Sequence, residues 1–138
     1  MNKKALLEFI KKHKIAVIST FGDKYPESSV VDFVANDQFE IIFNTFVGSR
    51  KYKNIFTNDS RHVSFVIGWE NLETVQYEGQ ALEVDNESLN EILEEHSKNF
   101  EYIRNWKVDE MRWFRVIPKW IKYSDYNKKP PKIEEFSF

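Results

Sequence analysis

Apolar and polar positions follow the spacing of β-strands over much of the chain. The segment 15–21 is a near-continuous apolar run rich in β-branched residues, which indicates a buried strand. In 61–69, every second residue from Val63 to Trp69 is apolar, as in a strand with one side against a core. The pattern predicts six strands, at residues 15–21, 27–35, 39–44, 61–69, 73–84 and 111–123.

One glycine and one proline predict interruptions of this regular pattern. The apolar phase of 73–84 shifts after Gly79, which indicates a β-bulge. Pro118 lacks a backbone N–H, so we expect a sheet edge or a bulge at this point of the last strand.

Three further segments have the apolar spacing of amphipathic helices. They are residues 3–12, 49–57 and the acidic segment 86–100. The C-terminal segment 128–138 contains two adjacent prolines and an apolar end, and we expect it to be extended and to lie on a partner subunit.

Strands with short connections and only peripheral helices predict a mainly β (α+β) fold, either an antiparallel barrel or a sandwich. The 138 residues are enough for one domain, 1–138, with a sizeable core. Aromatic residues make up 16% of the chain, which indicates a large core, a buried interface or a planar ligand.

Composition removes several classes of function. A formal net charge of −2 gives no general case for nucleic-acid binding. The absence of cysteine excludes disulfides and thiolate catalysis. The three histidines lie in different segments without a metal-binding spacing, so we expect no metal site. No run is apolar enough to cross a membrane, and we expect a cytoplasmic protein.

The start of the segment 49–57 holds the strongest candidate site. Ser49 is a good helix N-cap, yet the next two residues are the cations Arg50 and Lys51. The first turn of a helix is already positive, so two cations there are unfavourable unless an anion is bound. Backbone N–H groups, the Ser49 hydroxyl and both cations could hold a phosphate together; two solvated surface cations are the alternative.

This helix start, with the strand before it, resembles the phosphate-binding signature of the pyridoxamine 5′-phosphate oxidase-like flavoproteins. The resemblance extends, in the family's order and at similar spacing, over Phe43-Asn44-Thr45, Gly48-Ser49-Arg50-Lys51, residues 58–65, Trp69, Val75-Gln76-Tyr77-Glu78-Gly79 and residues 113–120. It implies a six-stranded antiparallel split β-barrel that forms a homodimer and binds FMN at the interface.

The resemblance also assigns residues to the cofactor. The Ser49 turn would hold the FMN phosphate, the preceding strand end would border the phosphate and ribityl chain, and the second strand would offer backbone groups to the flavin ring. An amide on the fifth strand would meet the flavin edge; Thr74 is the alternative in another register. The implied cofactor-binding residues are Ser28, Ser29, Val30, Val31, Asn44, Thr45, Ser49, Arg50, Lys51 and Gln76.

Two departures from the family concern its substrate. Relatives that oxidise pyridoxamine phosphate carry a lysine where this chain has Asp32 or Phe33. They also carry a basic C-terminal tract, whereas this chain ends in Glu134-Glu135-Phe136-Ser137-Phe138. We therefore do not expect pyridoxamine 5′-phosphate oxidase activity.

The sequence leaves two classes of function open. The first is an FMN-dependent oxidoreductase that acts on a small-molecule substrate or reductant, although no general acid or base stands out as a catalytic residue. The second is a non-catalytic module that binds or carries flavin or haem on the same fold, with His62 as a possible haem ligand. A deazaflavin in place of FMN is also compatible with the phosphate turn.

Overall fold

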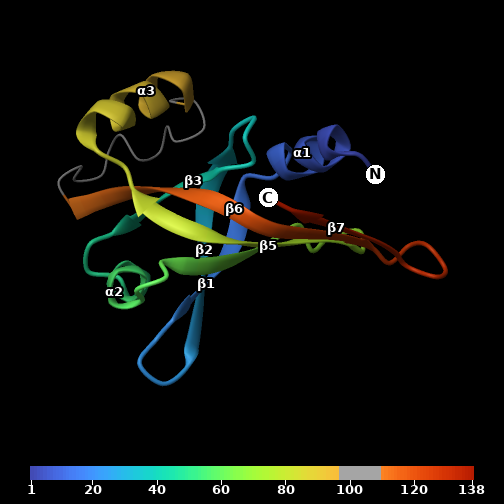
Figure 1. The fold of residues 1–138 in the computed structure, drawn as a ribbon, viewed down its shortest axis with the longest axis horizontal. Coiled ribbons are helices and arrows are strands. Elements are labelled where there is room, and N and C mark those ends of the chain that lie inside the picture. The colour runs from blue at the N-terminus through green and yellow to red at the C-terminus, as the bar shows by residue number, and fades with distance from the viewer. Residues whose placement is uncertain (97–109) are drawn as a thin grey trace.

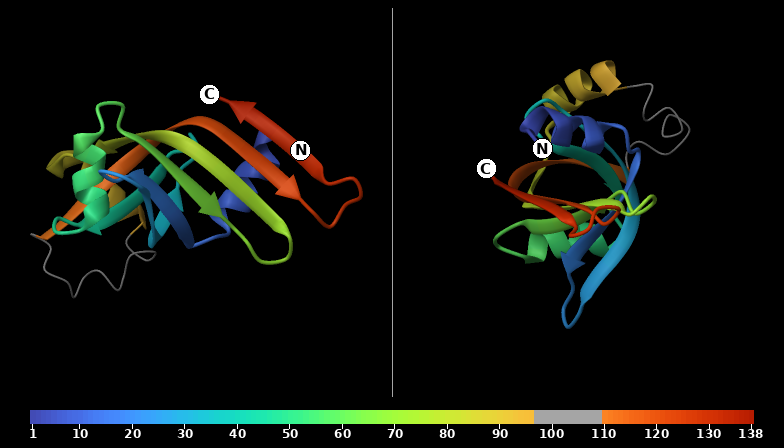
Figure 2. Two further views of the ribbon diagram at one scale, coloured as in Figure 1. Left: turned by 90° about the horizontal axis from the view of Figure 1, so that it is seen from below. Right: turned by 90° about the vertical axis from the view of Figure 1, so that its right-hand side faces the viewer.

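Six antiparallel strands curve around one core and close into a barrel in the computed structural model, which describes residues 1–96 and 110–138 (Figures 1 and 2). They are β1 (Ile15–Phe21), β2 (Pro26–Ala35), β3 (Ile41–Phe46), β4 (His62–Ile67), β5 (Glu73–Glu83) and β6 (Met111–Asp125). Neighbouring strands follow the order β3-β2-β1-β4-β5-β6, and pairing of β3 with β6 closes the barrel. The prediction of a mainly β, six-stranded antiparallel split barrel with peripheral helices is confirmed.

Strand β6 holds the barrel together because it has different partners along its length. One edge pairs with β5 from Phe114 to Asp125. On the other edge, 111–116 pair with β3, and 120–125 pair with β7 (Lys132–Ser137). Pro118, which has no N–H to donate, lies in the gap between these two partners.

A bulge lies at Gly79, opposite Pro118, as predicted, but the predicted shift of the apolar phase is wrong, because the buried alternation of β5 continues from Val75 to Ala81. Gly79 pairs with Pro118 while Glu78 pairs with Trp120, so Lys119 is an extra residue on β6. A Cβ atom on Gly79 would lie 2.9 Å from Cγ1 of Val116 and would also overlap a β6 carbonyl oxygen. The bulge therefore requires glycine because the backbone of β6 passes too close for a side chain.

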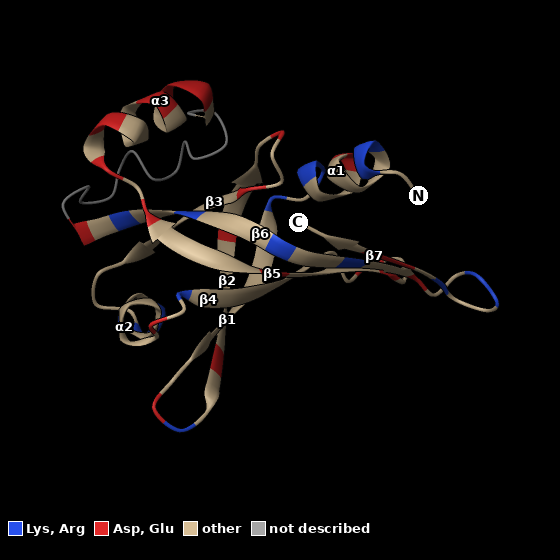
Figure 3. Ribbon diagram, in the orientation of Figure 1, with Lys and Arg blue, Asp and Glu red and all other residues tan. Residues whose placement is uncertain are grey.

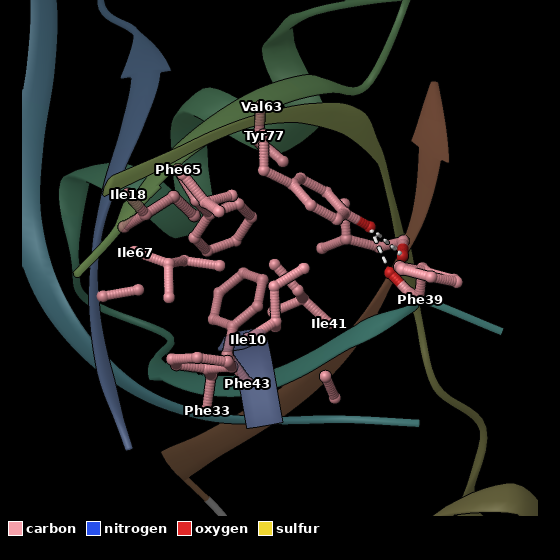
Figure 4. Close-up of a cluster of buried hydrophobic side chains, with 14 of the residues drawn as sticks. Ile10, Ile18, Phe33, Phe39, Ile41, Phe43, Val63, Phe65, Ile67 and Tyr77 are labelled. Atoms are coloured by element: carbon pink, nitrogen blue, oxygen red, sulfur yellow. Dashed lines mark hydrogen bonds between the residues drawn. The ribbon is translucent and has the colours of Figure 1, made fainter. Parts of the chain in front are cut away.

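Aromatic and branched side chains from all six barrel strands fill the core (Figure 4). Tyr77 is fully buried, and its hydroxyl lies 2.9 Å from the carbonyl oxygen of Phe39 and 3.0 Å from that of Val116. The Tyr77 hydroxyl is therefore a hydrogen-bond donor inside the apolar core, within reach of two backbone carbonyl groups. Burial, followed by the charge of Glu40, raises the pKa of Tyr77 well above its ordinary value.

Three helices lie outside the barrel. Helix α1 (Lys3–Lys11) begins at the cap Asn2 and adds Leu6, Phe9 and Ile10 to the core. Helix α2 (Arg50–Thr57) packs against β1 and β3. Helix α3 (Asn86–His96) carries an acidic face (Figure 3) and packs its apolar residues on Ile42 and Trp113. The predicted continuation of this helix, 97–100, lies outside the described residues.

The ends of two predicted strands move because of backbone conformation. The strand predicted at 61–69 ends at Ile67, since Gly68 has φ +77° and turns the chain, leaving Trp69 48% exposed. The strand predicted at 39–44 begins at Ile41, since Phe39, at φ 63°, still belongs to a turn. That turn is closed by the Asn36 side chain, which accepts from the amides of Gln38 and Glu40.

The C-terminal segment is extended, as predicted, and forms β7. It pairs antiparallel with β6 of the same chain, from Asp125 opposite Lys132 to Trp120 opposite Ser137. The amide of Phe138 donates to the carbonyl of Lys119, the bulged residue, at 3.1 Å. The segment therefore has an intramolecular partner that the sequence pattern did not identify.

We expect Gly79→Ala to lower the free energy of unfolding by about 2 kcal/mol or more, because the methyl group must displace β6. Urea unfolding followed by circular dichroism measures the change. Gly48→Ala is the matched control, since the nearest atom to its added Cβ lies 4.0 Å away. Equal stability of the two variants would contradict the close approach at the bulge.

Candidate functional site

The turn between β3 and α2 is built around the Ser49 hydroxyl. This hydroxyl donates to the carbonyl of Phe46 at 2.8 Å and accepts from the amide of Tyr52 at 3.3 Å. Thr45, at the end of β3, lies with its Oγ1 atom 2.8 Å from Ser49 Oγ. The predicted helix start with Ser49 as N-cap is therefore confirmed, and Thr45 fixes the cap from the strand.

Two cations follow the cap, and the first turn of α2 contains no acidic residue. The guanidinium of Arg50 is largely exposed, and its Nη1 atom lies 2.6 Å from a carboxylate oxygen of Glu27. Lys51 is half-buried, and partial burial lowers the pKa of its ammonium group. In the described part of the chain, Lys51 has no ion pair or hydrogen bond, so its charge is desolvated without compensation.

Glu27 links this turn to the hairpin of β1 and β2. It lies opposite Thr20 in the β1–β2 register, and its side chain is 22% exposed. Its Oε1 atom accepts from Nδ2 of Asn54 at 2.6 Å, and the same amide lies 3.1 Å from the Thr20 hydroxyl oxygen. Asn54 and Thr20 are buried, so these bonds fix α2 against the hairpin.

Sequence reasoning missed Glu27 and Asn54. Alternation along β2 places Glu27 on the inward side with Val31, and that periodicity could have identified an inward carboxylate. Asn54 precedes the buried Ile55 on the side of α2 that faces the barrel, where a polar residue needs a partner. No local signal pairs the two residues, because 27 positions separate them.

A cavity of about 80 Å³ opens where the hairpin meets α2. It is lined by Thr20, Glu27, Ser28, Ser29, Arg50 and Lys51. This volume is well below the roughly 300 Å³ of a complete ligand pocket, so the cavity has room for one small group of a larger ligand. The fold therefore brings the predicted phosphate turn next to the start of the predicted ring-binding strand.

The remaining residues of that strand divide between two sides of the sheet. Val31 faces the core and is 5% exposed, whereas Val30 faces outward and is 60% exposed. The register aligns Val30 with Val17, then Val66, then Gln76 on neighbouring strands. Gln76 is exposed on the same outer face, about 14 Å from Val30, because three interstrand spacings separate them.

Asn44 lies apart from the phosphate turn. Asn44 is the neighbour of Thr45 along β3, so the two side chains point to opposite sides of the sheet. In the register of β3 with β6, Asn44 lies opposite Trp113. Its Nδ2 atom is buried and has no hydrogen-bond partner among the described residues. The structure thus joins Thr45, but not the Asn44 side chain, to the Ser49 cap.

A second cavity lies near the candidate site, and the described residues show no metal cluster or membrane-spanning helix. His62 and Glu78 line a separate cavity of about 200 Å³ beside the β1–β2 hairpin. Residues 1–96 and 110–138 contain no cluster of three or more side chains suited to hold a metal ion. None of the helices in these ranges has the length and apolar character needed to cross a bilayer.

Comparison with known families identifies the class of protein to which the chain belongs. The family model described as pyridoxamine 5′-phosphate oxidase matches residues 3–125, which is most of the chain. The chain therefore belongs to the pyridoxamine 5′-phosphate oxidase family, as the resemblance of its motifs predicted. No curated protein matches the sequence.

Solved structures confirm the fold at low sequence identity. General stress protein 26 from Bacillus anthracis is 20% identical, with 99% of this chain and 100% of that chain covered and a TM-score of 0.73. A FAD-binding protein from Mesorhizobium loti is 11% identical, with 88% and 92% covered and a TM-score of 0.69. A heme binding protein from Mycobacterium smegmatis is 10% identical, with 95% and 56% covered and a TM-score of 0.77.

Removal of the helix cap is expected to destabilise the turn. Ser49→Ala should lower the free energy of unfolding by about 1 kcal/mol, because the Tyr52 amide loses its acceptor. Ser49→Thr keeps the hydroxyl and should retain most of the stability. Thermal or urea unfolding of both variants measures the difference, and equal losses would show that the hydroxyl does not stabilise this turn.

Proposed function

We propose that this protein is a homodimeric, FMN-binding oxidoreductase whose substrate is a small molecule of unidentified class. The observation that carries the proposal is the half-buried Lys51, which has no partner among residues 1–96 and 110–138 and lies beside Arg50 at a cavity of about 80 Å³. Membership of the pyridoxamine 5′-phosphate oxidase family supports a flavin as the ligand.

The donor set at the cavity fits a phosphate group. The amides of Arg50 and Lys51 are the first two of the helix and have no acceptor within it. Both side chains add positive charge, and the helix dipole favours an anion at the same point. Binding of an anion would compensate the charge of Lys51, which is desolvated by partial burial.

The outer part of β2 fits a flat, uncharged ring. Ser28 lines the cavity and Val30 follows on the same side of the strand, so the surface changes from polar to apolar away from the phosphate turn. When bound, FMN would supply hydride or electron transfer. Arg50 and Lys51 would bind the FMN phosphate. The outer face of β2 around Val30 would orient the flavin ring and keep water from the ring face that lies on it.

The same outer face supports a homodimer. Val30 and Val66 are 60% and 36% exposed, and Ile15 at the end of the same face is 43% exposed. Exposed apolar residues on neighbouring strands favour contact with a second copy of the chain, since a two-fold interface places one patch against itself. A flavin ring lying on β2 would then be covered by the partner.

A non-catalytic carrier on this fold is the second proposal. The carboxylate at the cavity, Glu27, is bound to Arg50 and Asn54 and is not positioned as a free general base. Haem is the alternative ligand, because His62 lines the neighbouring cavity. The absorption spectrum of the purified protein separates flavin from haem, and reduction of bound flavin by NADH or NADPH separates an oxidoreductase from a carrier.

The double variant Arg50→Ala with Lys51→Ala should bind FMN at least a hundredfold more weakly, because both phosphate-facing cations are lost. Fluorescence titration of the apoprotein measures the affinity, and circular dichroism checks the fold. The matched control is Lys24→Ala with Lys53→Ala, which removes two exposed cations from the hairpin and α2. Unchanged FMN affinity in the first variant would refute the phosphate assignment.

We expect light scattering to find a dimer in the wild type and a monomer in Val66→Lys, because the new charge lies at the centre of the outer apolar face. Leu82→Lys is the control, since Leu82 is 44% exposed but lies at the α3 end of β5. A monomeric wild type would contradict dimerisation. A Val66→Lys protein that remains dimeric would place the interface elsewhere.

A further inference from the structure

The cavity that we assign to a phosphate group already contains an anion, the carboxylate of Glu27. This carboxylate accepts from Arg50 at 2.6 Å and from Asn54 at 2.6 Å, so both of its oxygens are held. The β1–β2 hairpin also leaves room for it, because a Cβ atom on Gly22 would lie 2.9 Å from Cδ and Oε1 of Glu27. The geometry indicates a fixed position for this charge in the cavity wall.

Glu27 changes the charge that the cavity offers to a ligand. With Glu27, Arg50 and Lys51 all ionised, the side chains that line the cavity carry one net positive charge. A phosphomonoester near pH 8 carries two negative charges, since its second pKa is about 6. A phosphodiester carries one. The lining charge therefore matches a monoanion, and the second charge of a phosphomonoester is opposed by the nearby carboxylate.

We propose that Glu27 is a specificity-determining residue that weakens the binding of phosphomonoester flavins relative to phosphodiester flavins. The proposal depends on the proposed function, because it assumes that the flavin phosphate binds at Arg50 and Lys51. Glu27 acts through its negative charge in two ways. It occupies one edge of the Arg50 guanidinium, and it repels the bound phosphate across the cavity.

A purely structural role for Glu27 makes a different prediction. Its bond with Asn54 also fastens α2 to β2, so the loss of Glu27 could loosen the turn and weaken every ligand. Glu27→Gln separates the two roles, because the amide oxygen can still accept from Asn54 while the charge is removed. Asp23→Asn is the matched control, since it removes an exposed negative charge from the same hairpin.

The experiment compares three flavins on the apoprotein at pH 8 by fluorescence titration. FMN carries two negative charges on one phosphate, FAD carries one negative charge on each of the two phosphates of its pyrophosphate diester, and riboflavin carries no phosphate. We expect Glu27→Gln to bind FMN about tenfold more tightly than the wild type, the order of magnitude that Coulomb's law gives for a unit charge near a dianion with water-like screening. FAD should gain less, riboflavin should be unchanged, and the FMN gain should shrink in high salt.

Each outcome decides between the alternatives. Unchanged or weaker FMN binding by Glu27→Gln, with FMN still favoured over riboflavin in the wild type, overturns the role of Glu27 and leaves the phosphate site intact. Equal binding of FMN and riboflavin by the wild type overturns the phosphate site itself, and with it the proposed function. If Glu27→Gln does not fold, Glu27→Ala removes the same charge, and its riboflavin affinity measures any loosening of the turn. A ratio of FMN affinity to riboflavin affinity no higher than that of the wild type then overturns the proposal.

Discussion

Closure of the barrel through β6 is the constraint on which the other features depend. One strand has to pair with β5 along its length and still reach both β3 and β7 on its other edge. A regular flat strand cannot do so, and the bulge at Lys119, opposite Gly79, bends it between the two partners. Glycine is required there because the β6 backbone approaches too closely for a Cβ atom. The core around Tyr77 then stabilises the closed arrangement from inside.

Closure also fixes the site. Pairing with β6 holds β3 up to Phe46, and the chain turns directly from that end into α2. Helix α2 is anchored on the hairpin by the buried bonds among Asn54, Thr20 and Glu27, so the cations of its first turn face β2. Two contacts therefore define the cavity. One is the pairing of β3 with β6, and the other is the buried cluster of Asn54, Thr20 and Glu27.

The structure bears on how this chain differs from relatives that oxidise pyridoxamine phosphate. Of the two residues at the place of the family's lysine, Phe33 is buried in the core, and Asp32 pairs opposite Ile15 at the far end of β2. The C-terminal residues, where those relatives carry a basic tract, form β7 on the chain's own β6. The absence of pyridoxamine 5′-phosphate oxidase activity therefore stays a prediction, which rests on the missing lysine and the missing basic tract.

The sequence by itself determined the features that depend on neighbours in the chain. Strand periodicity, the Ser49 cap and a bulge at Gly79 were predicted, because each follows from spacing or backbone chemistry within a few residues. The family was predicted from the resemblance of the motifs to those of known flavoproteins. Only the tertiary structure decided that β3 closes on β6 and that Glu27 binds Arg50 and Asn54. Those contacts join residues far apart in sequence, and strand register, which no local pattern encodes, determines which of them meet.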